Sequence, residues 1–196
     1  PIWIMQGYIT MAYEAYLRME EKNIKPTHVF LQAGVGSMAS AVCGFFSSVY
    51  KEDKPIFTIV EPHKANCIFR TAKADDGKLH FVTGDMDTIM AGLACGEPNI
   101  IGWEILKSYA ENFLSVPDEV AAHGMRLLGN PLRGDERIIS GESGAVTAGV
   151  VSQLMTIEEL KEIKESLKLD ENSVVLCIST EGDTDFNNYR DIVWNG

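Results

Sequence analysis

Residues 29–42 read VFLQAGVGSMASAV, an apolar run followed by a glycine-rich turn and then by small residues. The apolar run predicts a buried strand over 27–32, and the small residues predict a helix over 37–51. Glycines in such a turn let backbone N–H groups approach an anion closely, and the start of a helix favours negative charge. The stretch therefore predicts a strand–loop–helix unit that can hold a phosphate. The alternative is a tight turn that only packs the helix on the strand.

Strand and helix patterns alternate along the rest of the chain. Further strands are expected at 55–62, 78–82 and 174–180. Helices are expected around residues 4–16 and over 64–74, 102–114, 117–128, 143–155 and 156–169. This alternation predicts an α/β fold with a mostly parallel sheet and helices on both faces. No repeat or linker interrupts it, so residues 1–196 are expected to form a single domain.

The position of the polar loops points to one site. Ligands of parallel sheets bind at the carboxyl ends of the strands. Segments 33–38, 140–145 and 179–185 leave a strand or open a helix, and all contain Gly, Ser, Thr or acidic residues. We therefore expect these three segments to meet at the site. Thr156 and Glu159 have the spacing of a capping box and predict the start of the helix over 156–169.

The composition excludes several classes of protein. The formal net charge of −11 argues against binding to nucleic acid or anionic membranes. No apolar stretch reaches the roughly 20 residues that a membrane span requires. The isolated cysteines Cys43, Cys67, Cys95 and Cys177 fit reduced thiols in a cytoplasmic protein. We expect no metal site, because the four histidines are scattered and the acids of the segment EGDTD are explained as helix caps or loop anchors.

The glycine loop also fits a different ligand. Residues 34–39, GVGSMA, match the dinucleotide fingerprint GxGxxG/A, and Glu61 ends the next predicted strand, where the fingerprint places an acid on the ribose. This pattern supports an alternative, a non-catalytic dinucleotide-binding domain. Ser179 and Thr180 after the last strand, and Glu142 at the start of a small-residue helix, are features that such a domain does not need.

Several longer segments resemble one enzyme family. They are QGYITMAYEA (6–15), LQAGVGSMA (31–39), GDMDTIMAGLACGEPN (84–99), LGNPLRGDERIISGESGAV (128–146) and ISTEGDTD (178–185). Together they resemble the diaminopropionate ammonia-lyases, a branch of the fold-type II pyridoxal-phosphate enzymes that include serine and threonine dehydratases. The resemblance implies part of a tryptophan synthase β-like large domain. It also implies α,β-elimination from 2,3-diaminopropionate to give pyruvate and ammonia, with pyridoxal phosphate as the cofactor.

The resemblance also implies roles for individual residues. The cofactor-binding positions that it assigns are Gly34, Val35, Gly36, Ser37 and Met38 around the phosphate, Gly92 with Leu93 beside the cofactor, Glu142 near the pyridine ring, and Ser179 or Thr180 at the pyridine nitrogen. A hydroxyl partner leaves that nitrogen largely unprotonated, which suits an elimination that needs only a short-lived carbanion equivalent. The choice between Ser179 and Thr180 stays open.

The family's catalytic residues have no counterpart in this sequence. No segment matches the context of the Schiff-base lysine, and the general bases are expected upstream of Pro1; Lys64 is the one lysine worth checking. We therefore expect residues 1–196 to be the C-terminal portion of the large domain, with the N-terminal half and the small domain absent and no turnover by this portion alone. Expected partners are an amino-acid substrate, the missing N-terminal half and a second copy in a homodimer. Two further alternatives are a serine/threonine dehydratase-like lyase and a purely structural half.

Overall fold

The computed structural model describes residues 2–195, so positions 1 and 196 of the predicted domain lie outside the described residues. These residues form a sheet of four parallel strands in the order β3-β2-β1-β4. The strands are β1 (His28–Gln32), β2 (Ile56–Pro62), β3 (Asn112–Val116) and β4 (Val175–Cys177). Parallel neighbours need crossover connections, and helices supply them here. The predicted α/β class with a parallel sheet is confirmed.

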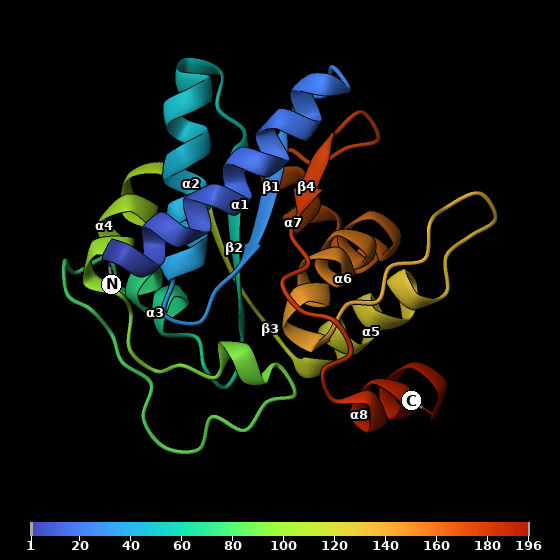
Figure 1. Ribbon diagram of the computed structural model, residues 1–196. Helices are drawn as coiled ribbons and strands as arrows, with labels where there is room; N and C mark the ends of the chain where they lie inside the picture. The colour runs from blue at the N-terminus through green and yellow to red at the C-terminus, as the bar shows by residue number, and fades with distance from the viewer. Residues whose placement is uncertain (1, 196) are drawn as a thin grey trace.

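Helices cover both faces of the sheet, as Figure 1 shows. One face carries α1 (Ile2–Glu21), α2 (Ser37–Tyr50), α3 (Cys67–Ala74) and α4 (Ile100–Tyr109). The other carries α5 (Asp118–Gly129), α6 (Glu142–Thr156) and α7 (Lys161–Ser166). The chain ends with α8 (Phe186–Arg190) and a π-helical turn (Asp191–Asn195), and 3-10 turns lie at Lys51–Asp53, Ala91–Leu93 and Glu158–Leu160. None of the helices within residues 2–195 has the length and apolar character to cross a membrane.

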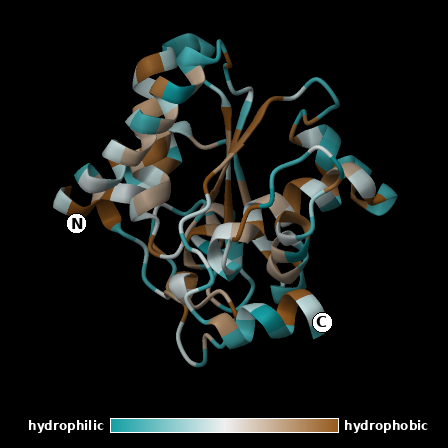
Figure 2. Ribbon diagram, turned by 45° about the vertical axis from the view of Figure 1, so that its right-hand side comes forward, coloured by the Kyte–Doolittle hydropathy of each residue, from teal (hydrophilic) through white to brown (hydrophobic). Residues whose placement is uncertain are grey.

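Side chains that alternate along β1 fill a core on each side of the sheet. Val29 and Leu31 are fully buried with Phe46 in the cluster beneath α1 and α2. Phe30 points the other way and is buried with Val146 in the cluster beneath α5 and α6. Figure 2 shows the same arrangement as hydrophobic strands in the centre of the molecule. Because both faces are covered, the strands read as continuous apolar runs rather than as an alternating pattern.

The predicted third strand is wrong in position. Residues 78–82 are irregular, although Val82 N donates to Gly96 O at 2.9 Å. The strand that pairs with β2 is instead β3, which the sequence pattern had placed at the end of a helix over 102–114. Helix α4 ends at Tyr109 because Ala110 turns to an extended conformation, with φ −84° and ψ 135°. Pairing with the free edge of β2 outweighs the helical periodicity that continues through this segment.

Two predicted boundaries near the C-terminus also change. Thr156 does not start a helix with Glu159: it is the last residue of α6, and its hydroxyl donates to Ser152 O at 2.8 Å within that helix. The capping-box prediction is therefore wrong. Strand β4 pairs with β1 only over residues 175–177, so the predicted strand over 174–180 is too long. Residues 178–182 leave the sheet as a loop, which frees their side chains to contribute to a site.

Candidate functional site

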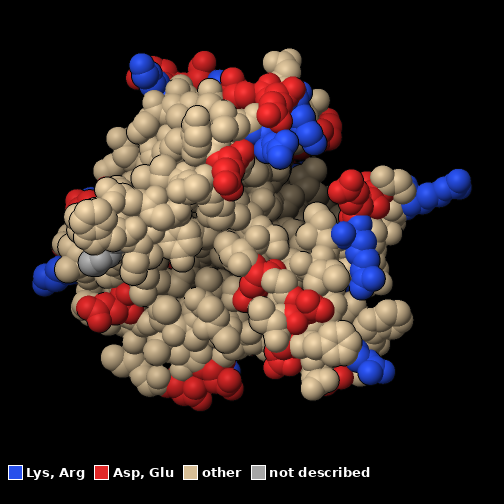
Figure 3. Space-filling view, in the orientation of Figure 1, with Lys and Arg blue, Asp and Glu red and all other residues tan. Residues whose placement is uncertain are grey.

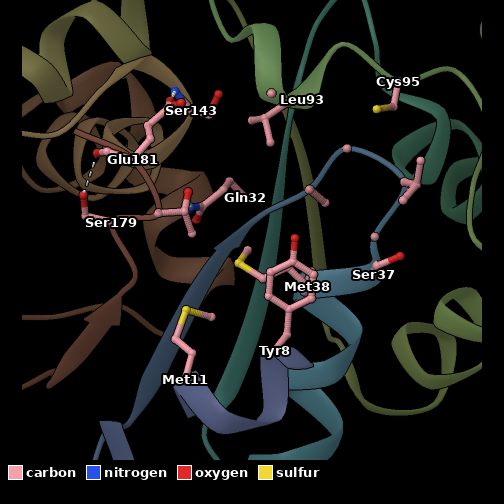
Figure 4. Close-up of a pocket in the computed structure, with 17 residues that line it drawn as sticks. Tyr8, Met11, Gln32, Ser37, Met38, Leu93, Cys95, Ser143, Ser179 and Glu181 are labelled. Carbon is pink, nitrogen blue, oxygen red and sulfur yellow. Dashed lines mark hydrogen bonds between the residues drawn. The ribbon is translucent and has the colours of Figure 1, made fainter. Parts of the chain in front are cut away.

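A cavity of about 430 Å³ lies at the carboxyl edge of the sheet, where β1 and β4 end (Figure 4). Its wall combines segments that are far apart in the sequence. The lining residues are Tyr8, Met11, Gln32, Ala33, Gly34, Val35, Gly36, Ser37, Met38, Ala39, Gly92, Leu93, Cys95, Ser143, Ser179, Thr180 and Glu181. The structure thus brings together the three polar loops that the sequence placed at strand and helix ends.

The glycine loop forms the wall at the start of α2. Gly36 precedes the helix with φ +88°, a conformation that glycine adopts without strain, and no side chain caps the helix. The first intrahelical bond runs from Ser40 N to Gly36 O, so the amides of residues 37–39 have no acceptor within the helix. A Cβ on Gly34 would lie 3.4 Å from Gly92 O and 3.1 Å from Cys95 Sγ. The loop therefore presents free backbone N–H groups in a tightly packed turn, which suits an anion.

The opposite wall is the N-terminus of α6 together with the loop after β4. Glu181 Oε1 accepts hydrogen bonds from the backbone N–H groups of Ser143 (2.6 Å) and Gly144 (3.3 Å). These bonds place the carboxylate at the positive end of the helix. The Ser143 hydroxyl is buried on the cavity wall and has no hydrogen-bond partner among the described residues. It is therefore a polar group that a ligand can satisfy.

A hydrogen-bond network joins the end of β1 to the loop after β4. Gln32, only 1% exposed, donates from Nε2 to Ile178 O at 2.8 Å and to Thr180 Oγ1 at 3.1 Å. Ser179 Oγ donates to Ser140 Oγ at 2.8 Å and also lies 3.4 Å from the carbonyl oxygen of Glu181. Figure 4 shows Gln32 and Ser179 on this side of the cavity. The two hydroxyls that the sequence could not separate thus have different partners.

Glu61 does not have the position that a dinucleotide would require. It is 1% exposed, and its two carboxylate oxygens accept from the backbone N–H groups of Ile68 (3.0 Å) and Phe69 (2.6 Å) at the start of α3. Burial raises the pKa of Glu61 to about 8, although these two amides oppose the shift. The side chain caps a helix below the surface, so it is not available to a ribose hydroxyl.

Of the ten positions assigned to the cofactor from sequence, nine line the cavity and Glu142 does not. Glu142 lies at the start of α6, but its carboxylate accepts a hydrogen bond from Asn188 Nδ2 of α8. The expectation that it lies near the cofactor ring therefore has no support in this geometry. Glu181 is the carboxylate that the start of α6 directs to the cavity.

Sequence reasoning did not single out several residues of the wall, although Ser143 lies in the segment 140–145 that it placed at the site. Tyr8 and Met11 come from α1, Cys95 from the irregular segment before α4, and Ser143 from the start of α6. Gln32 offered the clearest signal, because it is a polar residue at the end of an otherwise apolar strand. No lysine of residues 2–195 lines the cavity.

Lys64 lies elsewhere on the surface. Its side chain is 58% exposed, and its nearest charged partner is Asp87, with the two groups 3.9 Å apart. The described residues contain no group of three His, Cys, Asp or Glu side chains placed to hold a metal ion. The four cysteines form no disulfide with one another; Cys43 and Cys67 are buried, whereas Cys95 and Cys177 are partly exposed.

Known proteins resemble this chain in sequence over its whole length. Diaminopropionate ammonia-lyase of Escherichia coli K12 is 54% identical over 196 residues, which are 100% of this chain and 49% of that protein. The enzyme of the same name from Salmonella typhimurium LT2 is 52% identical over 198 residues, with the same coverage. The chain thus spans about half the length of the curated relatives that it matches.

Solved structures agree with the sequence comparison. The crystal structure of selenomethionine-substituted holo diaminopropionate ammonia-lyase from Escherichia coli superposes with a TM-score of 0.92 at 52% identity, covering 100% of this chain and 48% of that one. Threonine deaminase isoform 2 from Solanum lycopersicum shares the fold, with a TM-score of 0.73 at 17% identity over 96% of this chain and 48% of that one. Residues 2–181 match the family described as pyridoxal-phosphate dependent enzyme. The chain therefore belongs to the pyridoxal-phosphate dependent enzymes, as the sequence resemblance predicted.

Proposed function

We propose that this chain supplies the phosphate loop and the pyridine side of the cofactor site in a diaminopropionate ammonia-lyase. The observation that carries the proposal is the cavity in which the uncapped start of α2 faces the polar loop after β4. Its support in sequence is the 54% identity to the Escherichia coli enzyme over the whole chain. The reaction is the α,β-elimination of 2,3-diaminopropionate to pyruvate and ammonia.

The residues of the cavity fit pyridoxal phosphate. Its volume of about 430 Å³ lies within the range of roughly 300–1,000 Å³ that is usual for small-molecule pockets. The phosphate would lie against the free amides of residues 37–39, where a helix start stabilises negative charge. The buried Ser143 hydroxyl and the loop after β4 offer polar groups to the ring. The cofactor supplies the electron sink for the elimination, and this part of the protein binds and orients it.

The chain provides only part of a complete site. We propose that the Schiff-base lysine and the general bases belong to an N-terminal half, since the relatives are about twice as long and no described lysine reaches the cavity. Large apolar side chains exposed on α1 and α4, such as Trp3 (85% exposed) and Ile100 (67%), fit a surface that this half covers. In Figure 3 few charged residues lie over the N-terminal part of α1 and over α2, whereas charged residues gather at the C-terminal end of α1. A homodimer and a cytoplasmic location complete the proposal.

Two other functions have weaker support. A serine or threonine dehydratase would use the same scaffold. The threonine deaminase, however, is only 17% identical to this chain, so its similarity supports the fold alone. A dinucleotide-binding domain would need an acid on the ribose, whereas Glu61 is buried and bonded to the start of α3. The closely related ammonia-lyases therefore favour 2,3-diaminopropionate as the substrate.

The proposal is tested by locating the cofactor lysine in the full-length protein. The protein is incubated with pyridoxal phosphate, reduced with borohydride, and mapped by peptide mass spectrometry. We expect one stoichiometric adduct on a lysine that precedes this chain, together with release of pyruvate and ammonia from 2,3-diaminopropionate. The Lys64→Arg variant serves as the control and should keep both the adduct and the activity.

Other results would separate the alternatives. A stoichiometric adduct on Lys64 would refute the division of the site between two halves. A faster reaction with serine or threonine than with 2,3-diaminopropionate would favour the dehydratase function. Thermal stabilisation by NAD without any effect of pyridoxal phosphate would favour the dinucleotide-binding domain.

A further inference from the structure

We infer that Gln32 is a positioning residue: it holds the Thr180 hydroxyl as a hydrogen-bond donor directed into the cavity, so that Thr180 rather than Ser179 meets the pyridine nitrogen. This inference rests on the proposed function, because it concerns the orientation of a group toward pyridoxal phosphate. The observation behind it is the hydrogen-bond network of Gln32, Thr180, Ser179 and Ser140, which differs at the two hydroxyls.

The orientation of the Gln32 amide follows from its partners. A backbone carbonyl can only accept a hydrogen bond, so the amide group that lies 2.8 Å from Ile178 O must be the NH₂ and not the oxygen. The second hydrogen of the same NH₂ is left for Thr180 Oγ1, at 3.1 Å. Gln32 is 1% exposed and fixed at the end of β1, so it cannot turn away into solvent.

The Thr180 hydroxyl consequently accepts a hydrogen bond from Gln32, and its own hydrogen remains free to be donated. A hydroxyl has one hydrogen to donate and two lone pairs to accept with. Gln32 occupies one lone pair, and no group among the described residues accepts from Thr180 Oγ1. Because Thr180 lines the cavity, its hydrogen is available to an acceptor that lies there.

The Ser179 hydroxyl has the opposite arrangement. Its hydrogen is directed to Ser140 Oγ at 2.8 Å, and Ser140 Oγ in turn lies 3.3 Å from the Gly141 carbonyl, to which it donates. The Glu181 carbonyl, at 3.4 Å, is a second acceptor for Ser179. Ser179 can therefore offer the cavity only a lone pair, whereas an unprotonated pyridine nitrogen needs a donor.

The inference has a spectroscopic consequence that a merely structural role of Gln32 would not have. The nitrogen-15 chemical shift of the pyridine nitrogen separates an unbonded neutral nitrogen from a hydrogen-bonded one, and both from a protonated one. Phosphorus-31 spectra of the same samples report whether the phosphate still lies in its loop. The experiment therefore uses the full-length protein loaded with ¹⁵N-labelled pyridoxal phosphate.

Two substitutions at the hydroxyls choose between them. In Thr180→Val the nitrogen signal should move downfield, toward that of unbonded pyridine, and cofactor affinity should fall roughly 2- to 10-fold. Thr180→Ser should restore the wild-type signal, because it restores the hydroxyl. Ser179→Ala should leave the signal unchanged. A shift in Ser179→Ala but not in Thr180→Val would overturn the inference.

Substitution of Gln32 tests its positioning role. Gln32→Glu can donate at most one hydrogen bond, and Ile178 O takes it, so the Thr180 hydrogen must turn toward the new carboxyl group. The pyridine nitrogen then faces a lone pair of the Thr180 hydroxyl, which favours the protonated form of the nitrogen. The nitrogen-15 signal should therefore move upfield, in the direction opposite to that expected for Thr180→Val. An unchanged signal, or a downfield one, would refute the role.

A second variant keeps the role testable if Gln32→Glu does not fold. Gln32→Met has similar volume but neither donates nor accepts strongly, so Thr180 is no longer held in place. Its signal should move downfield, and a wild-type signal would overturn the role. If wild-type protein shows no bound phosphorus or nitrogen signal, the proposed function itself fails, which is a different outcome from a misassigned hydroxyl.

Discussion

The helix pair that carries Ser143 depends on two glycines, and Gly124→Ala tests this dependence. A Cβ on Gly124 of α5 would lie 2.1 Å from Ala145 O of α6, and one on Gly149 of α6 would lie 2.1 Å from Val120 O of α5. Ordinary contacts begin at 3.4 Å, and the obstacle is backbone, so the helices would have to separate by about 1 Å. Overpacking of this kind typically costs 1–3 kcal/mol, and we expect a loss of roughly 3 kcal/mol in unfolding free energy.

Gly7→Ala in α1 is the matched control. Nothing lies within 4 Å of a Cβ at Gly7, so this change should follow helix propensity alone and stabilise the protein by about 1 kcal/mol. For a chain of this length, 1 kcal/mol shifts Tm by roughly 2–4 °C. Calorimetry should therefore show Tm lowered by about 6–12 °C in Gly124→Ala and raised by about 2–4 °C in Gly7→Ala.

The comparison has a clear refuting result. If Gly124→Ala is as stabilising as Gly7→Ala, the close approach of α5 and α6 described here is wrong. The substitution should also weaken pyridoxal phosphate binding, because separation of the helices moves the start of α6 away from the cavity. Unchanged affinity alongside the expected loss of stability would mean that α6 does not position the ligand.

Three further predictions concern the surroundings of the cavity. Burial raises the pKa of Glu61 from 4.5 to about 8, so between these values the folded protein keeps a proton that the unfolded chain loses. The unfolding free energy should therefore fall by up to about 1.4 kcal/mol per pH unit between about pH 5 and 8. Urea unfolding of the Glu61→Gln variant should lack this pH dependence, and an equal slope in that variant would contradict the reasoning. The Gly36→Ala substitution places a side chain at φ +88° with its Cβ 2.7 Å from Ile68 Cδ1. Titration should show weaker binding of pyridoxal phosphate, and urea unfolding should show that the unfolding free energy falls by about 1–2 kcal/mol. Burial raises the pKa of the Cys43 thiol to about 12, whereas Cys95 is partly exposed on the cavity wall. A thiol reagent at pH 8 should therefore modify Cys95 before Cys43, and bound cofactor should slow the modification of Cys95. Faster labelling of Cys43 would contradict its burial in the core.

Much of the fold follows from local patterns. The apolar runs of β1 and β2 and the helices α2 and α6 lie close to the predicted ranges, because a buried parallel strand and a small-residue helix are each recognisable within one segment. β3 was missed, since its membership of the sheet depends on the register of Thr58 with Asn112 across the chain. The capping box at Thr156 failed for a related reason: α6 runs through this position, and the local signal carries no information about it.

The candidate site shows the same division. The glycine loop and the hydroxyls of Ser179 and Thr180 were recognised from sequence, because their residue types and their places after strands are local features. Gln32, Ser143 and Glu181 were not assigned to the cofactor, since their importance comes from hydrogen bonds to residues far along the chain. Glu142 and Glu181 are both acids, and only the packing of α6 against α8 and the loop after β4 decides which one faces the cavity.

The sequence by itself determined the α/β class, the glycine-rich turn before α2 and the enzyme family, because these depend on residue types in contiguous segments. The tertiary structure alone decided the third strand, the burial of Glu61 under the start of α3 and the different hydrogen-bond partners of Ser179 and Thr180. Each of these depends on which groups meet across the sheet, and burial makes the outcome definite: a polar group that is removed from water takes whatever partner the fold provides.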